Sequence, residues 1–152
     1  MTSTLPTTHT RTAGTALALR KAADLIRRSG WRQDDPASCA PAAELTAEEA
    51  ITDAAYSTFA RPEHGGYLPG TGAPQDAVLA TLDAFAGWLI MTGSHDANYV
   101  EFRGRRICQE WNDEDGRTMC QVTAALDMAA DVLAVHAALT PLAVRPLTMV
   151  GS

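Results

Sequence analysis

The sequence predicts one all-α domain, a small bundle of about four principal helices. Its 152 residues suit a single domain. Alanine accounts for 28 of them, and alanine has the lowest free-energy cost in a helix. Apolar residues also recur at spacings of three and four in four separate segments. Three cysteines are too few for a disulfide scaffold. The longest uninterrupted apolar run, Ala84 to Met91, is far short of the ~20 residues that a membrane span needs.

Three regions differ in composition. Residues 1–12 are rich in threonine without an apolar period, so we expect a disordered N-terminal tail. Residues 13–140 hold all four periodic segments and form the helical domain. Residues 141–152 follow the last helix, and we expect them to form an extended C-terminal arm.

The first helix is predicted from about Thr15 to Ser29, where Gly30 can adopt the left-handed conformation that ends a helix. Its apolar face consists of Leu19, Ala22, Ala23 and Ile26. The second helix is predicted to start at Thr46, because Thr46 and Glu49 have the spacing of a capping box. It should stop near Ala60, since a proline follows two residues later.

The third helix is predicted over about 75–92, with an apolar face broad enough for the most buried position. A long glycine- and proline-rich loop, 61–74, precedes it, and a short β-hairpin near 99–106 is expected after it. The last helix is predicted over about 118–140, opened by a capping box of Thr118 and Gln121. Its expected buried seam comprises Met119, Val122, Leu126, Ala129, Leu133 and His136.

The most distinctive stretch runs from Trp111 to Thr118. Asn112 and Asp113 precede a helix start, where side-chain oxygens can accept hydrogen bonds from free backbone N–H groups. Arg117 can bind a carboxylate through its planar guanidinium. We expect the binding surface to combine this stretch with the 61–74 loop, and the C-terminal arm is a further candidate part of it. The six candidate residues are Trp31, Tyr67, Trp111, Asn112, Asp113 and Arg117.

The same stretch carries a resemblance. The motif Trp111-Asn112-Asp113 followed by Arg117-Thr118, with Gly30-Trp31 and Cys39-Ala40 upstream, resembles a group of small, uncharacterised proteins of actinobacteria and their phages. The resemblance covers most of residues 17–139 and implies an all-α fold. It implies no known activity. A single lysine among 12 basic residues agrees with a GC-rich actinobacterial source.

Catalytic candidates are few. Cys39 lies before the second helix, where a thiol pKa can be lowered, and His64 or His95 could serve as its base with Asp96 or Asn112 as the orienting group. No nucleophile signature surrounds Cys39, and an inert thiol is the competing interpretation. No histidine or cysteine pair has the spacing of a zinc site, so we expect no metal and no cofactor.

Charge is segregated along the chain. Residues 1–32 carry a net charge of +5 and residues 33–63 a net charge of -6, which favours contact between these two segments over nucleic-acid binding. Because no catalytic constellation is evident and the N-terminal segment has no apolar stretch typical of secretion, we expect a cytoplasmic, non-catalytic binding or regulatory accessory protein. Its expected partner is a protein or a small molecule and not a membrane. A homodimer is one form of this hypothesis. The alternatives are a small cysteine- or metal-dependent hydrolase or transferase, and a weak nucleic-acid binder acting through the basic first helix.

Overall fold

A computed structural model describes residues 8–34, 43–60, 73–95 and 103–143. These residues form five helices: α1 (Thr8–Ser29), α2 (Ala47–Phe59), α3 (Ala73–Met91), α4 (Gly104–Asn112) and α5 (Met119–Ala143). The described part of the chain contains no strand, only an isolated parallel bridge between Trp31 and Leu45. The predicted all-α fold is thus confirmed.

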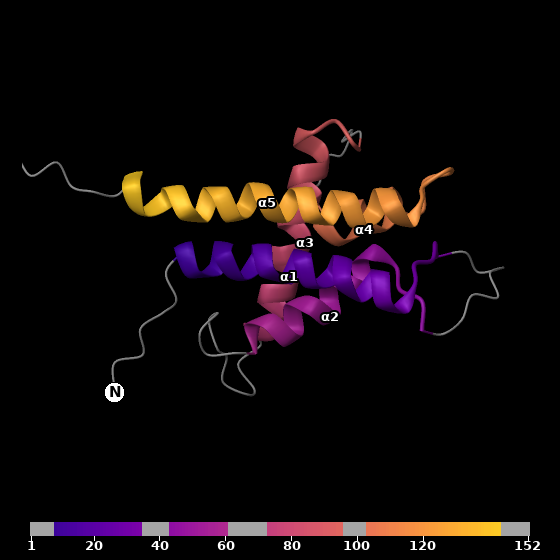
Figure 1. Ribbon diagram of the computed structural model, residues 1–152, viewed down its shortest axis with the longest axis horizontal. Coiled ribbons are helices and arrows are strands. Elements are labelled where there is room, and N and C mark those ends of the chain that lie inside the picture. Colours follow the sequence, from indigo (N-terminus) through magenta and orange to yellow (C-terminus); the bar gives the residue numbers. More distant parts are fainter. Residues whose placement is uncertain (1–7, 35–42, 61–72, 96–102, 144–152) are drawn as a thin grey trace, which may run out of the picture.

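The two longest helices organise the fold. Helices α1 and α5 lie side by side and run antiparallel, while α3 crosses both (Figure 1). Helix α2 packs against α1 and α3, and α4 packs mainly against α3. The alanine content explains the close α1–α5 contact, because small side chains let helix axes approach. Fully buried alanines on these two helices are Ala18, Ala22, Ala23, Ala129 and Ala130.

The aromatic residues fill the middle of the core. Trp111 is 2% exposed and meets the ring of Phe85 edge-on, with 5.5 Å between ring centroids. Phe85 also stacks on Trp88, at 6.2 Å. Edge-to-face and offset-stacked pairs are the arrangements that aromatic rings prefer. These ring contacts connect the end of α4 to the centre of α3. Helix α3 is the helix whose broad apolar face led us to expect a buried position.

The predicted helix ends are confirmed where local chemistry determines them. Gly30 ends α1 with φ +94°, in the left-handed region that glycine enters without a steric penalty. The backbone N–H of Glu49 donates to the Thr46 hydroxyl, and the Glu49 carboxylate accepts from the Thr46 N–H, so the capping box of α2 is complete. Thr118 and Gln121 form the same reciprocal pair at the start of α5.

The hairpin expected near 99–106 is wrong over the residues that the structure describes. Arg103 is an extended N-cap and residues 104–106 form the first turn of α4, while 99–102 lie outside the described residues. The helix forms because its side chains at helical spacing (Ile107, Cys108 and Trp111) are all buried. At Gly104 a Cβ atom would lie 2.2 Å from the Asp83 carboxylate oxygen, so the missing side chain permits a very close approach to α3.

Helix α1 begins earlier than predicted. It starts at Thr8 instead of Thr15, so residues 8–12, expected in a disordered tail, are helical. We attribute the earlier start to packing against α5, which extends to Ala143 and is the main neighbour of α1. Similarly, the last two residues of the expected 61–74 loop belong to α3. Residues 1–7 and 144–152 lie outside the described residues.

The seam predicted on α5 is correct only in its middle. Val122, Leu126 and Ala129 are fully buried, but Met119 and His136 are exposed.

Among the described helices, α5 alone is long and apolar enough over Met119–Leu139 to cross a membrane. Length and composition are the only basis of this finding, and the core helix of a soluble protein passes the same test.

Candidate functional site

Asn112, the last residue of α4, is the centre of the polar stretch that the sequence singled out. Its side chain is fully buried and makes four hydrogen bonds. The Oδ1 atom accepts from the Trp31 indole N–H at 2.7 Å and from the Ala47 backbone N–H at 3.0 Å. The Nδ2 atom donates to the Arg32 carbonyl at 3.2 Å and to the Asp113 carboxylate at 2.8 Å. Every hydrogen-bonding position of this amide is therefore used.

These bonds join three elements. Ala47 is the first residue of α2, and the N–H groups of a first helical turn have no partner within their own helix. Asn112 supplies that partner from a position 65 residues away in the sequence. Trp31 and Arg32 directly follow α1, so the same amide also holds the end of that helix. The predicted role in satisfying backbone N–H groups is correct, but the helix served is α2 and not the one that follows Asn112.

Asp113 and Gln33 extend the contact on the exposed side. Asp113 Oδ1 accepts a second hydrogen bond from the Asp34 backbone N–H at 2.9 Å. Gln33 Nε2 donates to the carbonyl oxygens of Asn112 at 3.3 Å and Glu114 at 2.8 Å. Sequence reasoning missed Gln33, because an isolated glutamine in an irregular segment has no pattern that reveals its partner.

Arg117 covers the other side of Trp111. Its guanidinium carbon lies 4.3 Å from the indole ring centroid, a cation–π distance. Its Nε atom donates to the Trp111 carbonyl at 3.0 Å, and its Nη2 atom pairs with the Glu114 carboxylate. The predicted carboxylate partner of Arg117 thus exists within the same loop. We call the seven residues joined by these contacts the Asn112 cluster: Trp31, Arg32, Gln33, Trp111, Asn112, Asp113 and Arg117.

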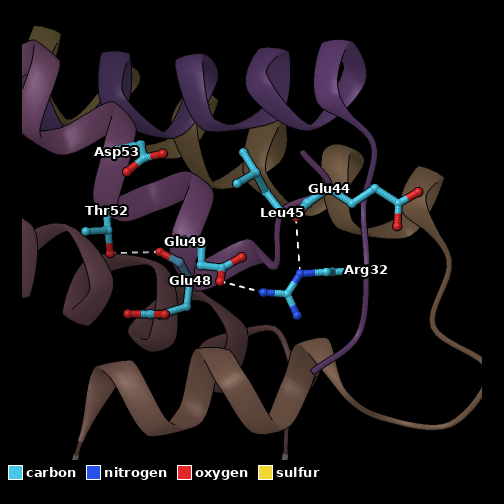
Figure 2. A pocket seen from close by; sticks show the side chains of 7 residues that line it. All are labelled: Arg32, Glu44, Leu45, Glu48, Glu49, Thr52 and Asp53. Carbon is cyan, nitrogen blue, oxygen red and sulfur yellow. Dashed lines mark hydrogen bonds and ion pairs between the residues drawn. The ribbon is translucent and has the colours of Figure 1, made fainter. Parts of the chain in front are cut away.

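A small pocket borders the cluster at Arg32 (Figure 2). Its volume is about 310 Å³, and Arg32 reaches across it to the Glu49 carboxylate at 2.6 Å and to the Glu44 carbonyl at 3.1 Å. The lining residues are Arg32, Glu44, Leu45, Glu48, Glu49, Thr52 and Asp53. The Glu49 carboxylate already pairs with the positive charge of Arg32, so the arrangement resembles an internal ion pair more than a prepared ligand site.

A second, wider pocket lies on the α4 side. It has a volume of about 730 Å³ and is lined by Asp34, Arg103, Arg105, Arg106, Gln109, Glu110 and Asp113. Two of its arginines make ion pairs, Arg105 with Glu48 at 3.0 Å and Arg106 with Glu110 at 2.7 Å. Acidic and basic groups are balanced here, so the basic Arg103–Arg106 run does not present an uncompensated positive surface.

Of the four catalytic candidates, the structure describes only His95. Its ring lies between two carboxylates, with Nδ1 at 3.0 Å from Glu114 and Nε2 at 3.7 Å from Glu110. These contacts attach the end of α3 to the Asn112 cluster through Glu114. Cys39, His64 and Asp96, together with the binding candidate Tyr67, lie outside the described residues.

The two described cysteines differ in environment. Cys108 is fully buried and donates to the Leu82 carbonyl at 3.6 Å, and burial raises the pKa of its thiol far above the ordinary range. It therefore stays protonated and inert. Cys120 is exposed in the first turn of α5. Within the described residues, no group of three histidine, cysteine, aspartate or glutamate side chains could hold a metal ion.

The five described binding candidates lie together, joined by the contacts given above. Two of them, Trp111 and Asn112, are buried by the contacts given above, so a ligand could reach them only if the cluster opened. The contacts explain why these residue types are present in terms of the fold. Ligand binding by the cluster stays a prediction.

Comparison with known proteins agrees with one part of the resemblance noted in the sequence, that to a family of uncharacterised proteins. A family model described as a family of unknown function, DUF6197, matches residues 10–132. No curated protein and no solved structure matches the chain. The matched range includes α1 from its third residue, all of α2, α3 and α4, the first half of α5 and the whole Asn112 cluster. The chain belongs to DUF6197, a family of unknown function.

Proposed function

We propose that this protein is a non-catalytic binding protein whose Asn112 cluster is a structural clamp and whose docking surface lies on α5. The surface is a row of four large apolar side chains, which we call the α5 stripe: Met128, Val132, Val135 and Leu139. The occupant that fits it is an amphipathic helix with a matching apolar row. The observation that carries the proposal is the exposure of the whole row on a helix whose opposite side is buried.

The exposed fractions along the stripe are high. They are 51% for Met128, 54% for Val132, 59% for Val135 and 56% for Leu139. Single exposed apolar residues are common on soluble proteins, but a contiguous row of them indicates an interaction site. The spacing of four, three and four residues is that of one strand of a helix–helix seam. An α-helix in a partner is therefore the complementary shape.

The opposite side of α5 is already occupied. Val122, Leu126, Ala129 and Ala130 are fully buried, and α5 packs chiefly against α1. At the edge of the stripe, Asp131 pairs with Arg20 of α1 at 2.6 Å. The stripe is thus a second apolar face of one helix, separate from the face that the fold itself uses.

The Asn112 cluster supports a non-catalytic role. Its polar side chains bond to one another and to backbone groups, with all four positions of the Asn112 amide used, except that the buried indole N–H of Trp111 has no hydrogen-bond partner. A catalytic site instead directs polar groups toward the space that a substrate will occupy. The cysteine-dependent alternative depends on Cys39, and labelling that thiol at different pH values would test it independently.

Photo-crosslinking in living cells tests the proposal. A benzophenone amino acid is placed at Val135, in the stripe, or at Met91, which is 86% exposed at the end of α3. We expect a discrete adduct from position 135 that is absent from position 91. No adduct from position 135, or equal adducts from both positions, would contradict a docking role for the stripe.

A further inference from the structure

We infer that the helix that docks on the α5 stripe is α5 of a second copy of this chain, running antiparallel, so that the protein is a homodimer. The inference rests on the proposed docking function and names its partner. In an antiparallel pair of α5 helices, a residue of one copy lies at the same height along the axis as a residue of the other copy when their two numbers add up to a fixed sum. The centre of the stripe lies between Val132 and Val135, which places Val132 opposite Val135 of the second copy. Met128 then lies opposite Leu139 of the second copy.

This register is self-complementary in size. The two smaller, β-branched side chains meet at the centre, and the two longer side chains meet at each end. A twofold-symmetric interface requires such self-complementarity, because the same surface must serve both sides. The α5 stripe of each copy covers the α5 stripe of the other, so the interface needs no second surface.

Charge favours the antiparallel direction over the parallel one. The chain has a net charge of -6, and Asp127 and Asp131 lie along α5 beside the stripe. A parallel pair would place each carboxylate level with its equivalent in the second copy. The antiparallel pair separates the two Asp131 residues by five residues along the axis, about 7 Å. It also opposes the two helix dipoles, which parallel helices would align.

The edges of the stripe argue for a helix and against a lipid surface. Asp131 and Asp127 pair with Arg20 and Arg27 of α1, and all four side chains are between 36% and 63% exposed. A flat bilayer that covered the stripe would also have to cover these charged groups, whereas a single helix lies along the row and leaves them in water. The same charged edge can remain solvated as the polar rim of a protein interface.

The interface is small. The stripe spans twelve residues, from Met128 to Leu139, an axial length of about 17 Å. An interface of this size is at the lower end of specific contacts, so we expect a dissociation constant on the order of micromolar. The dimer should therefore dissociate on dilution within an accessible concentration range.

Analytical ultracentrifugation of the purified full chain tests the inference. We expect the weight-average mass to rise from 16.1 kDa toward twice that value as concentration increases through the micromolar range. The double variant Val132→Glu, Val135→Glu places a glutamate opposite a glutamate of the second copy at both central contacts. It should weaken association by more than tenfold. Met91→Glu introduces the same charge at an exposed apolar residue outside the stripe and should leave association unchanged.

A charge-swapped variant tests the direction. In Val132→Glu, Val135→Lys, the antiparallel pair places each glutamate opposite a lysine, so the dimer should persist. A parallel pair would place like charges opposite each other, and the variant would be monomeric. Circular dichroism verifies that all variants are folded, as expected for exposed positions. A monomeric charge-swapped protein would overturn the antiparallel arrangement.

The remaining outcomes separate this inference from the proposed function. A wild-type chain that stays monomeric overturns the homodimer, while a discrete adduct from position 135 in cells would still support docking of another protein. A dimer unaffected by the double glutamate variant would place the interface elsewhere and overturn the inference. Monomeric protein that binds vesicles of phosphatidylglycerol and phosphatidylethanolamine, and loses this binding in the double glutamate variant, would show that the stripe contacts lipid.

Discussion

Asn112→Ala is the substitution that most directly tests the clamp. It removes the acceptor of the Ala47 N–H, which is fully buried, and of the Trp31 indole N–H, which is partly buried. A buried donor left without an acceptor costs about 1–3 kcal/mol. The free-energy cost of leaving the Ala47 N–H without an acceptor should lie near the upper limit of this range. The cost for the Trp31 indole N–H should lie near the lower limit, because water can reach the partly buried indole. We expect a total loss in unfolding free energy of roughly 3–4 kcal/mol.

Chemical denaturation with urea measures this loss, and thermal unfolding should show a decrease in Tm of about 10 °C. Gln109→Ala is the matched control, since it removes an exposed amide from the same helix and should change the free energy by less than about 0.5 kcal/mol. An Asn112→Ala protein within about 1 kcal/mol of the wild type would refute the reasoning, because the four bonds would then contribute almost nothing.

The isosteric variant Asn112→Asp adds a pH dependence of known sign. It keeps the oxygen that accepts from Ala47 and replaces the donor with an oxygen beside the Asp113 carboxylate, where the amide now donates at 2.8 Å. Burial and the neighbouring charge both raise the pKa of the new carboxyl group in the folded state. The folded protein then binds a proton more tightly than the unfolded chain, so the variant should gain stability as pH falls. Stability that decreased toward low pH, relative to the wild type, would contradict this account.

Two further predictions concern single sites. Gly104→Ala should destabilise the protein by about 1–3 kcal/mol, since the new Cβ would meet the Asp83 backbone. Gly87→Ala in α3 places its Cβ where nothing lies within 4 Å and should stabilise the protein by about 0.5–1 kcal/mol. Changes of unfolding free energy with the same sign for both variants, measured by urea denaturation, would refute the packing argument. Because burial raises the pKa of Cys108, the unfolded chain loses that thiol proton at a lower pH than the folded chain. Unfolding free energy should therefore decline above the ordinary thiol pKa, by up to about 1.4 kcal/mol per pH unit from this group, and Cys108→Ala should remove that part of the slope.

The candidate site shows which features of a site a sequence pattern can predict. Trp111, Asn112 and Asp113 stood out because an amide and a carboxylate beside a helix start have a capping chemistry that sequence alone reveals. The contacts that these residues make were not predicted, although Trp31 was itself a candidate. The donors that bind Asn112, Trp31 and Ala47, are 81 and 65 residues away, and no local spacing encodes such a pair.

Short-range chemistry determined what the sequence could predict. The capping boxes of α2 and α5 and the end of α1 at Gly30 depend on contacts between residues at most four positions apart. The four long helices were predicted from apolar residues at spacings of three and four. Tertiary packing alone decided the rest. Helix α4 is short and polar apart from three buried side chains, so its formation depends on α3. Helix α5 is apolar on two sides, and only the position of α1 decides which side becomes core and which side stays exposed as the α5 stripe.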